Sequence, residues 1–451
     1  MKFRHGFFWM ILSATLSSSL TYGQTPADKM DELITAYTRS YKFNGTVLVA
    51  HDGKIIFEKG YGFKNAKDST KNDVNTIYQL GSITKQFTAT AILKLAEQKK
   101  LSTDDRLSKY FPGYPSGDSI TIKNLLTHSS GIYNYTEDQP FMKSEAVKPS
   151  TKEKMIAMFR DHPLNFSPGS NYSYSNSGYL LLGYIIEQAT DKPYEKVIHE
   201  LIITPLKMNH TGFDFTNLKS PDKAIGYTML NQVAKIPAGI VDSSVSFAAG
   251  AMYSTVEDLL KWHMAFQQNQ IISKVSTEAA FTPYKSKYGY GWTIDTLFGK
   301  RTVEHGGGIF GFNTYISRVP SDNVVVIILN NMNVGGLENI AHSLLAIIFG
   351  RPYEIPKEKS EVPVDSGILA QYVGEYEFGP GFTVKISLVN NKLKVQPTGQ
   401  SAYDLFAESD HEFFMKIIEA KATFVKGPDG KVEKLLWKQS GTPEQTGKKI
   451  K

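Results

Sequence analysis

The alternation of apolar and polar residues predicts a sheet built from both ends of the first three quarters of the chain. Short apolar runs at 46–50 and 54–59 flank His51-Asp52-Gly53, and Asp-Gly is a strong signal for the turn of a β-hairpin. Far downstream, residues 324–329 are continuously apolar, as in a buried strand. Helical patterns lie between these strands. This order favours an α+β sandwich, in which an antiparallel sheet is flanked by helices and accompanied by a helical subdomain.

Helices are predicted where apolar residues recur every three to four positions. Residues 30–41 form a short amphipathic segment, and residues 178–190 carry a second apolar stripe. The pattern that starts at Ser82 places Ile83, Phe87, Ala91 and Leu95 on one face. Ser254-Thr255-Val256-Glu257 is typical of a capping box that opens a helix, and Gly335-Gly336 precedes one that ends near Phe349.

The pattern changes after Arg351. Residues 352–363 contain three prolines and five charged residues, which is typical of a linker. The remaining sequence consists of short alternating runs, separated by turn candidates such as Asn390-Asn391 and Asp429-Gly430. It predicts a small antiparallel β-barrel. The expected division is a signal peptide at 1–23, a main domain at 24–351, a linker at 352–366 and a β-domain at 367–451.

The first residues have the order of a secretory signal peptide. Lys2 and Arg4 precede a largely apolar stretch at 7–16, and small or polar residues lead to Gly23. The apolar stretch is shorter than the roughly 20 residues that a membrane span needs. No cysteine follows it for lipid attachment. We therefore expect cleavage after Gly23, no membrane anchor in the mature chain, and a secreted or periplasmic protein.

Composition excludes several classes of function. The 451 residues include no cysteine, so disulfides, thiolate metal sites and cysteine nucleophiles are absent. The net charge of +6 arises from 50 basic and 44 acidic residues and is too small to indicate nucleic-acid binding. The ten histidines show no metal-binding spacing. We expect no metal, no cofactor and no nucleic acid, and the sequence makes no prediction of oligomeric state.

The segment Ser82-Ile83-Thr84-Lys85 is the first candidate for catalysis. Residues three apart on a helix share a face, so the hydroxyl and the amine can meet. A serine hydroxyl needs a base at neutral pH, and a lysine can serve when burial lowers its pKa. The N–H of Ser82 at the helix start can face a developing oxyanion. The same spacing recurs at Ser220-Pro221-Asp222-Lys223, where no apolar helix follows and a surface turn is the better interpretation.

Two further segments add functional groups. Tyr174-Ser175-Asn176 precedes an apolar helix; flanking cations can lower the pKa of a phenol, and a carboxamide can bind a substrate amide. The plainer alternative is a tyrosine-rich loop that packs its rings. His305-Gly306-Gly307-Gly308 allows a backbone to approach a ligand, with a histidine as cation, proton relay or donor. Its alternatives are a glycine-rich hairpin and the oxyanion loop of lipase-type hydrolases, whose Gly-x-Ser-x-Gly elbow this chain lacks.

Taken in order, Ser-x-x-Lys, Tyr-x-Asn and His-x-Gly resemble the serine hydrolases of the penicillin-binding protein and class C β-lactamase superfamily. The resemblance covers roughly residues 28–350 and extends to segments 78–85, 124–131, 249–255 and 288–292. His128, in the second of these segments, is interpreted as a structural residue. The tail is similar to the lipocalin-like β-domains that some members carry, with residues 371–376 resembling the entry to the first strand.

The resemblance implies a role for each matched residue. Ser82 forms the acyl-enzyme, Lys85 takes its proton directly or through Tyr174, and Tyr174 passes a proton to the leaving group. Asn176 orients the acyl-side amide of the substrate. The N–H groups of Ser82 and Gly308 form the oxyanion hole, and the substrate-binding set also includes His305 and Gly307. Many relatives have a lysine at the position of His305, and a histidine is only fractionally charged at neutral pH.

We therefore expect a secreted serine hydrolase that cleaves an ester or amide through an acyl-enzyme on Ser82. Peptidase or esterase activity on small or D-amino-acid-containing substrates, including carboxypeptidase-like cleavage, is favoured. β-Lactamase activity is the alternative, weakened by the histidine at 305. A protein of another class, a catalytically silent penicillin-binding-like receptor or scaffold, is disfavoured because such a module has no need of Ser82, Lys85, Tyr174 and Asn176 together. The expected partner is a small-molecule or peptide substrate.

Overall fold

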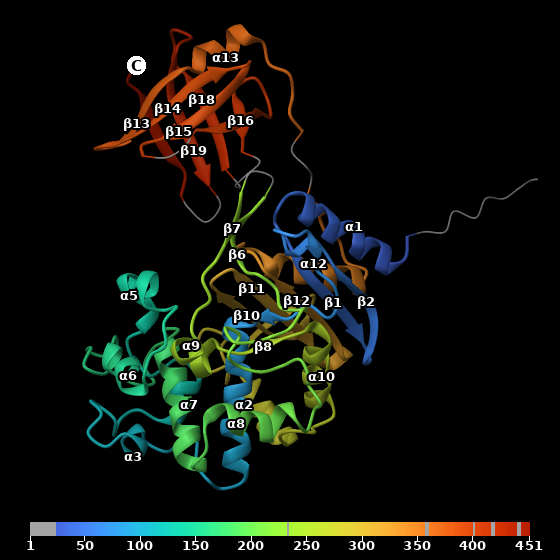
Figure 1. Ribbon diagram of the computed structural model, residues 1–451, viewed down its shortest axis with the longest axis vertical. Helices are drawn as coiled ribbons and strands as arrows, with labels where there is room; N and C mark the ends of the chain where they lie inside the picture. The colour runs from blue at the N-terminus through green and yellow to red at the C-terminus, as the bar shows by residue number, and fades with distance from the viewer. Residues whose placement is uncertain (1–23, 232–233, 357–359, 400–401, 416–419, 440–442) are drawn as a thin grey trace, which may run out of the picture.

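The computed structural model describes residues 24–231, 234–356, 360–399, 402–415, 420–439 and 443–451. A large body of sheet and helices carries a β-barrel at one end (Figure 1). The signal peptide predicted at residues 1–23 lies outside the described residues. Within the described part of the chain, no helix combines the length and the hydrophobicity needed to cross a membrane.

The main sheet joins strands from opposite ends of the domain. Its order is β2-β1-β12-β11-β10-β9, and every neighbouring pair is antiparallel, which confirms the predicted sheet. The N-terminal hairpin pairs directly with the last strand, Val47 opposite Ile328. The six strands are β1 (Gly45–His51), β2 (Lys54–Gly60), β9 (Thr293–Leu297), β10 (Lys300–Ile309), β11 (Phe312–Val319) and β12 (Val324–Asn330).

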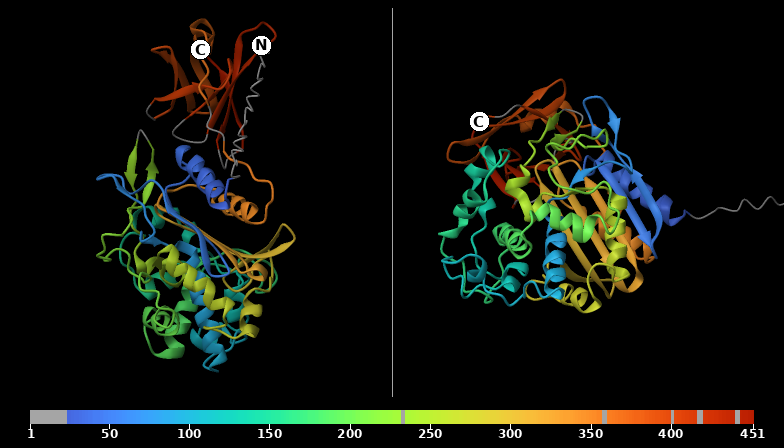
Figure 2. Two further views of the ribbon diagram at one scale, coloured as in Figure 1. Left: turned by 90° about the vertical axis from the view of Figure 1, so that its right-hand side faces the viewer. Right: turned by 60° about the horizontal axis from the view of Figure 1, so that its bottom comes forward.

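Helices cover both faces of this sheet, and this explains the continuous apolar run of β12. On one face, α1 (Pro26–Arg39) and α12 (Leu337–Ile348) pack together (Figure 2). α10 (Val256–Gln267) contacts β1 and β12 on the other face. Val324 and Val326 of β12 belong to the first of these cores, whereas Val325 belongs to the second. A strand buried on both sides has no polar face to alternate with.

The helical subdomain is organised around α7 (Asn176–Thr190). Residues 177–186 of α7 are all buried, because other helices surround it.

The further helices of this body are α2 (Thr84–Glu97), α3 (Leu107–Tyr110), α4 (Ile122–Leu126), α5 (Gln139–Ser144), α6 (Lys152–Arg160), α8 (Tyr194–Ile198), α9 (Ser243–Gly250) and α11 (Lys274–Ala280). Shorter turns are η1 (Gly81–Ile83), η2 (Tyr135–Glu137), η3 (His199–Ile203) and η4 (Pro320–Asp322). Small strand pairs are β3 (Phe63–Asn65) with β4 (Thr70–Lys71), β5 (Tyr78–Gln79) with β8 (Tyr253–Ser254), and β6 (Tyr227–Leu230) with β7 (Lys235–Pro237).

Two helix starts differ from the sequence prediction. The cap of α10 is Thr255, whose hydroxyl accepts from the N–H of Asp258, and not Ser254. Ser254 instead pairs its buried hydroxyl with that of Thr211. Ser82 does not start an α-helix but lies in the 3₁₀ turn η1, and α2 begins at Thr84.

The C-terminal region is a closed eight-stranded antiparallel barrel, as predicted in kind. The sequence prediction missed β16, β20 and the helix α13 (Ser366–Tyr372), whose seven residues are too few to show a helical period. One of the short alternating runs of the sequence, residues 412–418, was expected to be a single strand; it contains β17, which ends at Phe414, and residues 416–418 lie outside the described residues. The strands are β13 (Gly374–Gly379), β14 (Phe382–Val389), β15 (Lys392–Pro397), β16 (Tyr403–Ala407), β17 (Glu412–Phe414), β18 (Ala420–Lys426), β19 (Val432–Gln439) and β20 (Gln445–Lys449).

Candidate active site

A close approach between η1 and β10 places Ser82. Gly81 has a φ of 55°, in the region that favours glycine. A Cβ on Gly81 would lie 2.9 Å from the backbone nitrogen of Gly308. The turn that carries Ser82 therefore packs directly against the strand that carries Gly308, and two stretches more than two hundred residues apart form one side of the site.

Lys85 is fully buried beside Ser82. Its Nζ lies 3.1 Å from Ser82 Oγ, 2.8 Å from Asn176 Oδ1 and 2.8 Å from the carbonyl oxygen of Ala249. Burial holds the pKa of Lys85 well below its ordinary value. A neutral amine has two hydrogens, which suit the oxygens of Asn176 and Ala249, and one lone pair, which is then left to face the Ser82 hydroxyl.

Tyr174 lies over the same amine. Its ring is 4.8 Å from Lys85 Nζ, and its phenol shares a hydrogen bond with Ser82. Burial raises the pKa of Tyr174 above its ordinary value, and the Ser82 hydrogen bond only partly offsets this. The expectation that flanking cations lower this pKa is wrong, because burial of the phenol disfavours its charged form. Tyr174 is a proton donor at neutral pH.

Asn176 begins α7 and is fixed by residues that the sequence analysis missed. Its Nδ2 donates to Thr136 Oγ1 at 3.1 Å, and its backbone N–H donates to Asn134 Oδ1 at 3.0 Å. With its own Oδ1 held by Lys85, the carboxamide has one orientation. Neither Asn134 nor Thr136 has a sequence signal of its own, since Asn134 directly precedes the short turn η2 and Thr136 lies within it.

His305 is a neutral, enclosed residue and not a cation. Its Nδ1 lies 2.6 Å from the carbonyl oxygen of Gly306, which can only accept, so Nδ1 carries the proton. Nε2 therefore accepts from the hydroxyl of Tyr288 at 2.8 Å. Burial lowers the pKa of His305 to about 4. Both ring nitrogens are occupied, which corrects the expectation of a fractional positive charge at this position.

Two other predicted residues support the site from behind. A Cβ on Gly307 would lie 2.0 Å from the carbonyl oxygen of Leu80, so this glycine permits β10 to pack against the chain before Ser82. His128 accepts from the N–H of Ser175 through Nδ1, and its ring lies 4.2 Å from that of Tyr174. His128 is thus a packing residue at the base of the site, as the sequence analysis interpreted it.

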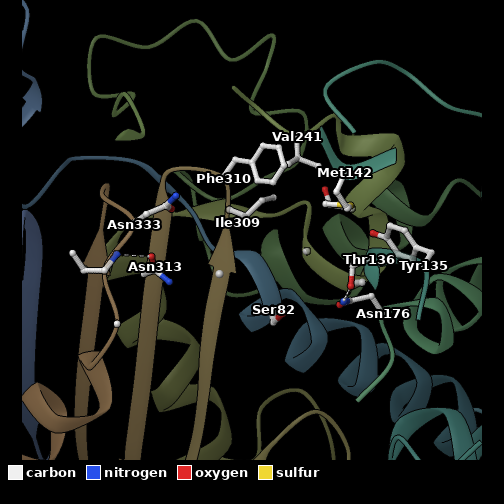
Figure 3. A pocket seen from close by; sticks show the side chains of 16 residues that line it. Ser82, Tyr135, Thr136, Met142, Asn176, Val241, Ile309, Phe310, Asn313 and Asn333 are labelled. Atoms are coloured by element: carbon white, nitrogen blue, oxygen red, sulfur yellow. Dashed lines mark hydrogen bonds between the residues drawn. The ribbon is translucent and has the colours of Figure 1, made fainter. Parts of the chain in front are cut away.

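A cleft of about 600 Å³ opens at Ser82 (Figure 3). Gly308 and Asn176 line it, whereas Lys85, Tyr174, His305 and Gly307 do not. The structure thus brings the predicted residues into one neighbourhood but divides them into a cleft-lining group and a buried group.

The only described residues whose side chains could together hold a metal ion are Glu304, Glu338 and His342, whose ligand atoms lie within 4.8 Å of one another. Glu304 already accepts from Ser317 and Tyr315 and bonds His342 at 3.1 Å. Burial alone would raise the pKa of Glu304, but the hydrogen bonds from His342 and Ser317 outweigh it and hold this pKa low. The hydrogen bond with Glu304 raises the pKa of His342. We interpret the group as an ion pair behind β10.

This ion pair predicts a pH-dependent stability. The ion pair stabilises the folded state at pH values above the unfolded pKa of glutamate and below the unfolded pKa of histidine. This stabilisation is lost as the pH rises through the raised pKa of His342. We expect His342→Gln to lower the free energy of unfolding by about 1 kcal/mol more at pH 5.5 than at pH 9. Urea unfolding at both pH values measures this. The exposed pair of His411 and Asp410 is the control for a surface ion pair, and His411→Gln should cost less stability at pH 5.5 than His342→Gln does. An equal loss at both pH values would contradict the assignment.

Comparisons with known proteins agree with this fold. A sequence profile described as "Beta-lactamase" matches residues 30–347, and the chain belongs to this family, whose members and penicillin-binding relatives are mostly serine hydrolases. A second profile, "Domain of unknown function (DUF3471)", matches residues 358–451. The resemblance stated from the motifs is thereby confirmed for the family and for the presence of a C-terminal barrel.

Individual relatives extend over most of the chain. Penicillin-binding protein 4* of Bacillus subtilis is 28% identical over 448 residues, which cover 94% of this chain and 98% of that protein. The putative penicillin-binding protein PbpX of the same organism is 34% identical, covering 70% and 78%. The octameric penicillin-binding protein homologue from Pyrococcus abyssi has a TM-score of 0.65 at 27% identity, covering 93% and 99%. A D-stereospecific amidohydrolase from Streptomyces sp. has a TM-score of 0.61 at 27% identity, covering 73% and 100%.

Proposed function

We propose that this protein is a serine hydrolase that cleaves an ester or amide of a small or D-amino-acid-containing substrate through an acyl-enzyme on Ser82. The observation that carries the proposal is the position of Lys85, buried, low in pKa and 3.1 Å from Ser82 Oγ. Its two other contacts, Asn176 and Ala249, leave the serine as the group that its lone pair faces. A lysine buried in this way does not stabilise the fold through its charge, because burial disfavours the charged form.

The proposed reaction has two halves. In the first, Ser82 Oγ attacks the substrate carbonyl carbon while its proton moves to Lys85 Nζ, and the N–H groups of Ser82 and Gly308 stabilise the oxyanion. The tetrahedral species then expels the leaving group, which takes a proton from Tyr174, and Tyr174 regains one from Lys85. In the second half, water attacks the acyl-enzyme, a proton returns to Ser82 Oγ, and the carboxylic acid product leaves.

The substrate class rests on two supports. The similarity to a D-stereospecific amidohydrolase favours amide or ester cleavage at a D-residue. The neutral state of His305 disfavours β-lactamase activity, because the cation that would bind a substrate carboxylate at this position is missing. A silent scaffold is disfavoured by the contacts among Ser82, Lys85 and Asn176, which a binding protein does not require.

Active-site labelling tests the proposal. A fluorophosphonate probe reacts with an activated serine, so we expect a single label, mapped by peptide analysis to Ser82. Ser220 is a matched control within the chain, since it has the same Ser-x-x-Lys spacing but its Lys223 bonds the carbonyl oxygen of Thr216. Absence of label on the folded protein would favour the scaffold. Equal labelling of Ser82 and Ser220 would mean that Lys85 does not activate its serine.

We further propose that the chain is exported and that residues 1–23 are removed. The support is the order of a basic start, an apolar stretch and small residues before Gln24. N-terminal sequencing of the protein expressed with its full leader tests this. The expected first residue is Gln24, and recovery of the uncleaved chain from the cytoplasm would contradict the proposal.

A further inference from the structure

The cleft at Ser82 is neutral. Of the described residues that line it, none carries a charge. A charged group that enters such a cleft loses hydration and meets no opposite charge that would offset the loss. Lys85 does not supply one, because it is buried outside the lining and its pKa is low. The cleft therefore favours substrate groups without a charge.

One part of the cleft is apolar. Met142, Val241 and the adjacent pair Ile309 and Phe310 come from three separate segments and converge at its upper rim in Figure 3. Ile309 directly follows the proposed oxyanion donor Gly308 on β10. A substrate that extends from the reacting carbonyl along this strand thus contacts hydrocarbon first.

Two carboxamides line the cleft beside β10, and one of them, Asn313, lies opposite Gly308 on the neighbouring strand β11. Asn333 Oδ1 accepts from the N–H of Gly311 at 3.0 Å, and Asn313 Oδ1 accepts from the N–H of Val334 at 3.1 Å. Because only the oxygen of a carboxamide can accept, each NH₂ group is turned away from its bond. Neither NH₂ group has a hydrogen-bond partner among the described residues, and that of Asn313 would lie 3.6 Å from a Cβ on Gly308. Two oriented donors are therefore available at this end.

The position of this pair assigns it to one arm of the substrate. Figure 3 shows Asn313 and Asn333 on one side of Ser82, and Asn176 with Tyr135 and Thr136 on the other. Asn176 is the group proposed above to hold the acyl side. The acyl and leaving-group arms depart from the reacting carbonyl in different directions, so the asparagine pair faces the leaving-group arm.

Building on the proposed function, we infer that the leaving group is uncharged and bears a hydrogen-bond acceptor that Asn313 and Asn333 bind. The substrate class is an ester or amide whose leaving group ends in a carboxamide, ester or further peptide bond. A leaving group that ends in a free carboxylate is disfavoured. The enzyme would then cleave within a chain or release a blocked end, and would not remove a free terminal residue as a carboxypeptidase does.

Matched thioesters test this inference. N-acetyl-D-alanyl thioesters of thioglycolamide, thioglycolate and propanethiol have leaving groups of similar size that end in a carboxamide, a carboxylate and a methyl group. Thiol release is followed with a colorimetric thiol reagent, and a chain without cysteine gives no background. We expect kcat/KM for the thioglycolamide ester to exceed that for the thioglycolate ester by about tenfold or more. Equal values would overturn the inference.

Isosteric variants distinguish the role of the NH₂ groups as donors to the substrate from the role of the side-chain oxygens as acceptors from the backbone. Asn313→Asp and Asn333→Asp keep the oxygen that accepts from the backbone but replace the NH₂ group by an oxygen. We expect each to lower kcat/KM for the thioglycolamide ester at least fivefold and to leave the propanethiol ester within twofold. Asn333→Lys should raise kcat/KM for the thioglycolate ester. Retention of the carboxamide preference in both aspartate variants would overturn the inference.

A binding measurement distinguishes failure of this inference from failure of the proposed function. Calorimetry on the Ser82→Ala variant compares N-acetylglycinamide with N-acetylglycine, which needs no turnover. Preferential binding of the amide supports the subsite, and this preference should be lost when Asn313→Asp is added to Ser82→Ala. If no thioester is hydrolysed but the amide still binds preferentially, only the proposed hydrolase activity fails. Equal affinity for both ligands overturns the inference, whatever the enzyme activity.

Discussion

Replacing Ser82 by alanine is expected to lower kcat/KM for p-nitrophenyl acetate by at least about 10⁴-fold, because the covalent route is lost altogether. The alanine leaves the contacts of Lys85 with Asn176 and Ala249 in place, so the fold should be unaffected. Initial rates on the purified variant measure the loss, with the unfolding temperature as the check on folding. The residual activity of the Ser82→Ala variant should equal the rate that substrate binding and oxyanion stabilisation provide without a nucleophile.

The control for this variant is Ser220→Ala. Ser220 accepts from the N–H of Asp222 in a turn, and no observation connects it with the cleft. Its removal should change kcat/KM by less than twofold. A comparable loss in both variants, or a Ser82→Ala enzyme with more than about a tenth of the parent activity, is incompatible with an acyl-enzyme on Ser82.

The second large effect is expected from Lys85→Met, which keeps the length of the side chain and removes the base. Loss of a positioned general base costs about 10²–10⁴-fold, and we expect about 10³-fold in kcat/KM for the same ester. Lys85→Arg is the matched control, because it keeps a cation at this place that cannot give up its proton. Both variants should be similarly inactive. An active Lys85→Arg enzyme would mean that the lysine acts through its charge.

The role of Lys85 as a base also predicts the direction in which kcat/KM changes with pH. The parent enzyme needs an unprotonated Lys85, so kcat/KM should rise with pH through the lowered pKa of that amine and then level off. His305, with a pKa of about 4, and Tyr174, with a raised pKa, keep their protonation states between about pH 6 and 9. The ascending limb therefore belongs to Lys85 and should disappear in Lys85→Met. A descending limb in this range would contradict the assignment.

The sequence predicted the parts of the fold that repeat a local pattern. The hairpin at His51-Asp52-Gly53, the doubly buried β12 and the barrel at the C-terminus all follow from apolar periodicity and turn residues. The motifs also indicated which segments would meet, and Lys85 contacts both Ser82 and Asn176. The start of α2 was misplaced because residues 81–83 form a 3₁₀ turn before the α-helix. The cap of α10 was misplaced because Ser254 and Thr255 have the same capping chemistry.

The remaining features of the site depend on contacts between distant residues. The neutrality of His305 results from Tyr288, seventeen positions away, and from burial, neither of which a local motif encodes. The same holds for the pKa of Tyr174, which is raised because the folded chain buries its phenol. Asn313 and Asn333 carry no motif; they become a pair only because β11 begins, and antiparallel β12 finishes, at the same end of the sheet.

The pairing of β1 with β12 has a consequence for how the chain reaches its native state. Gly45 lies opposite Asn330, so the first strand has no central partner until nearly the whole domain has left the ribosome. Contacts between such distant positions make folding slow, because a large loop must close before the contact is gained. The central part of the main sheet can therefore close only after β12 has been synthesised.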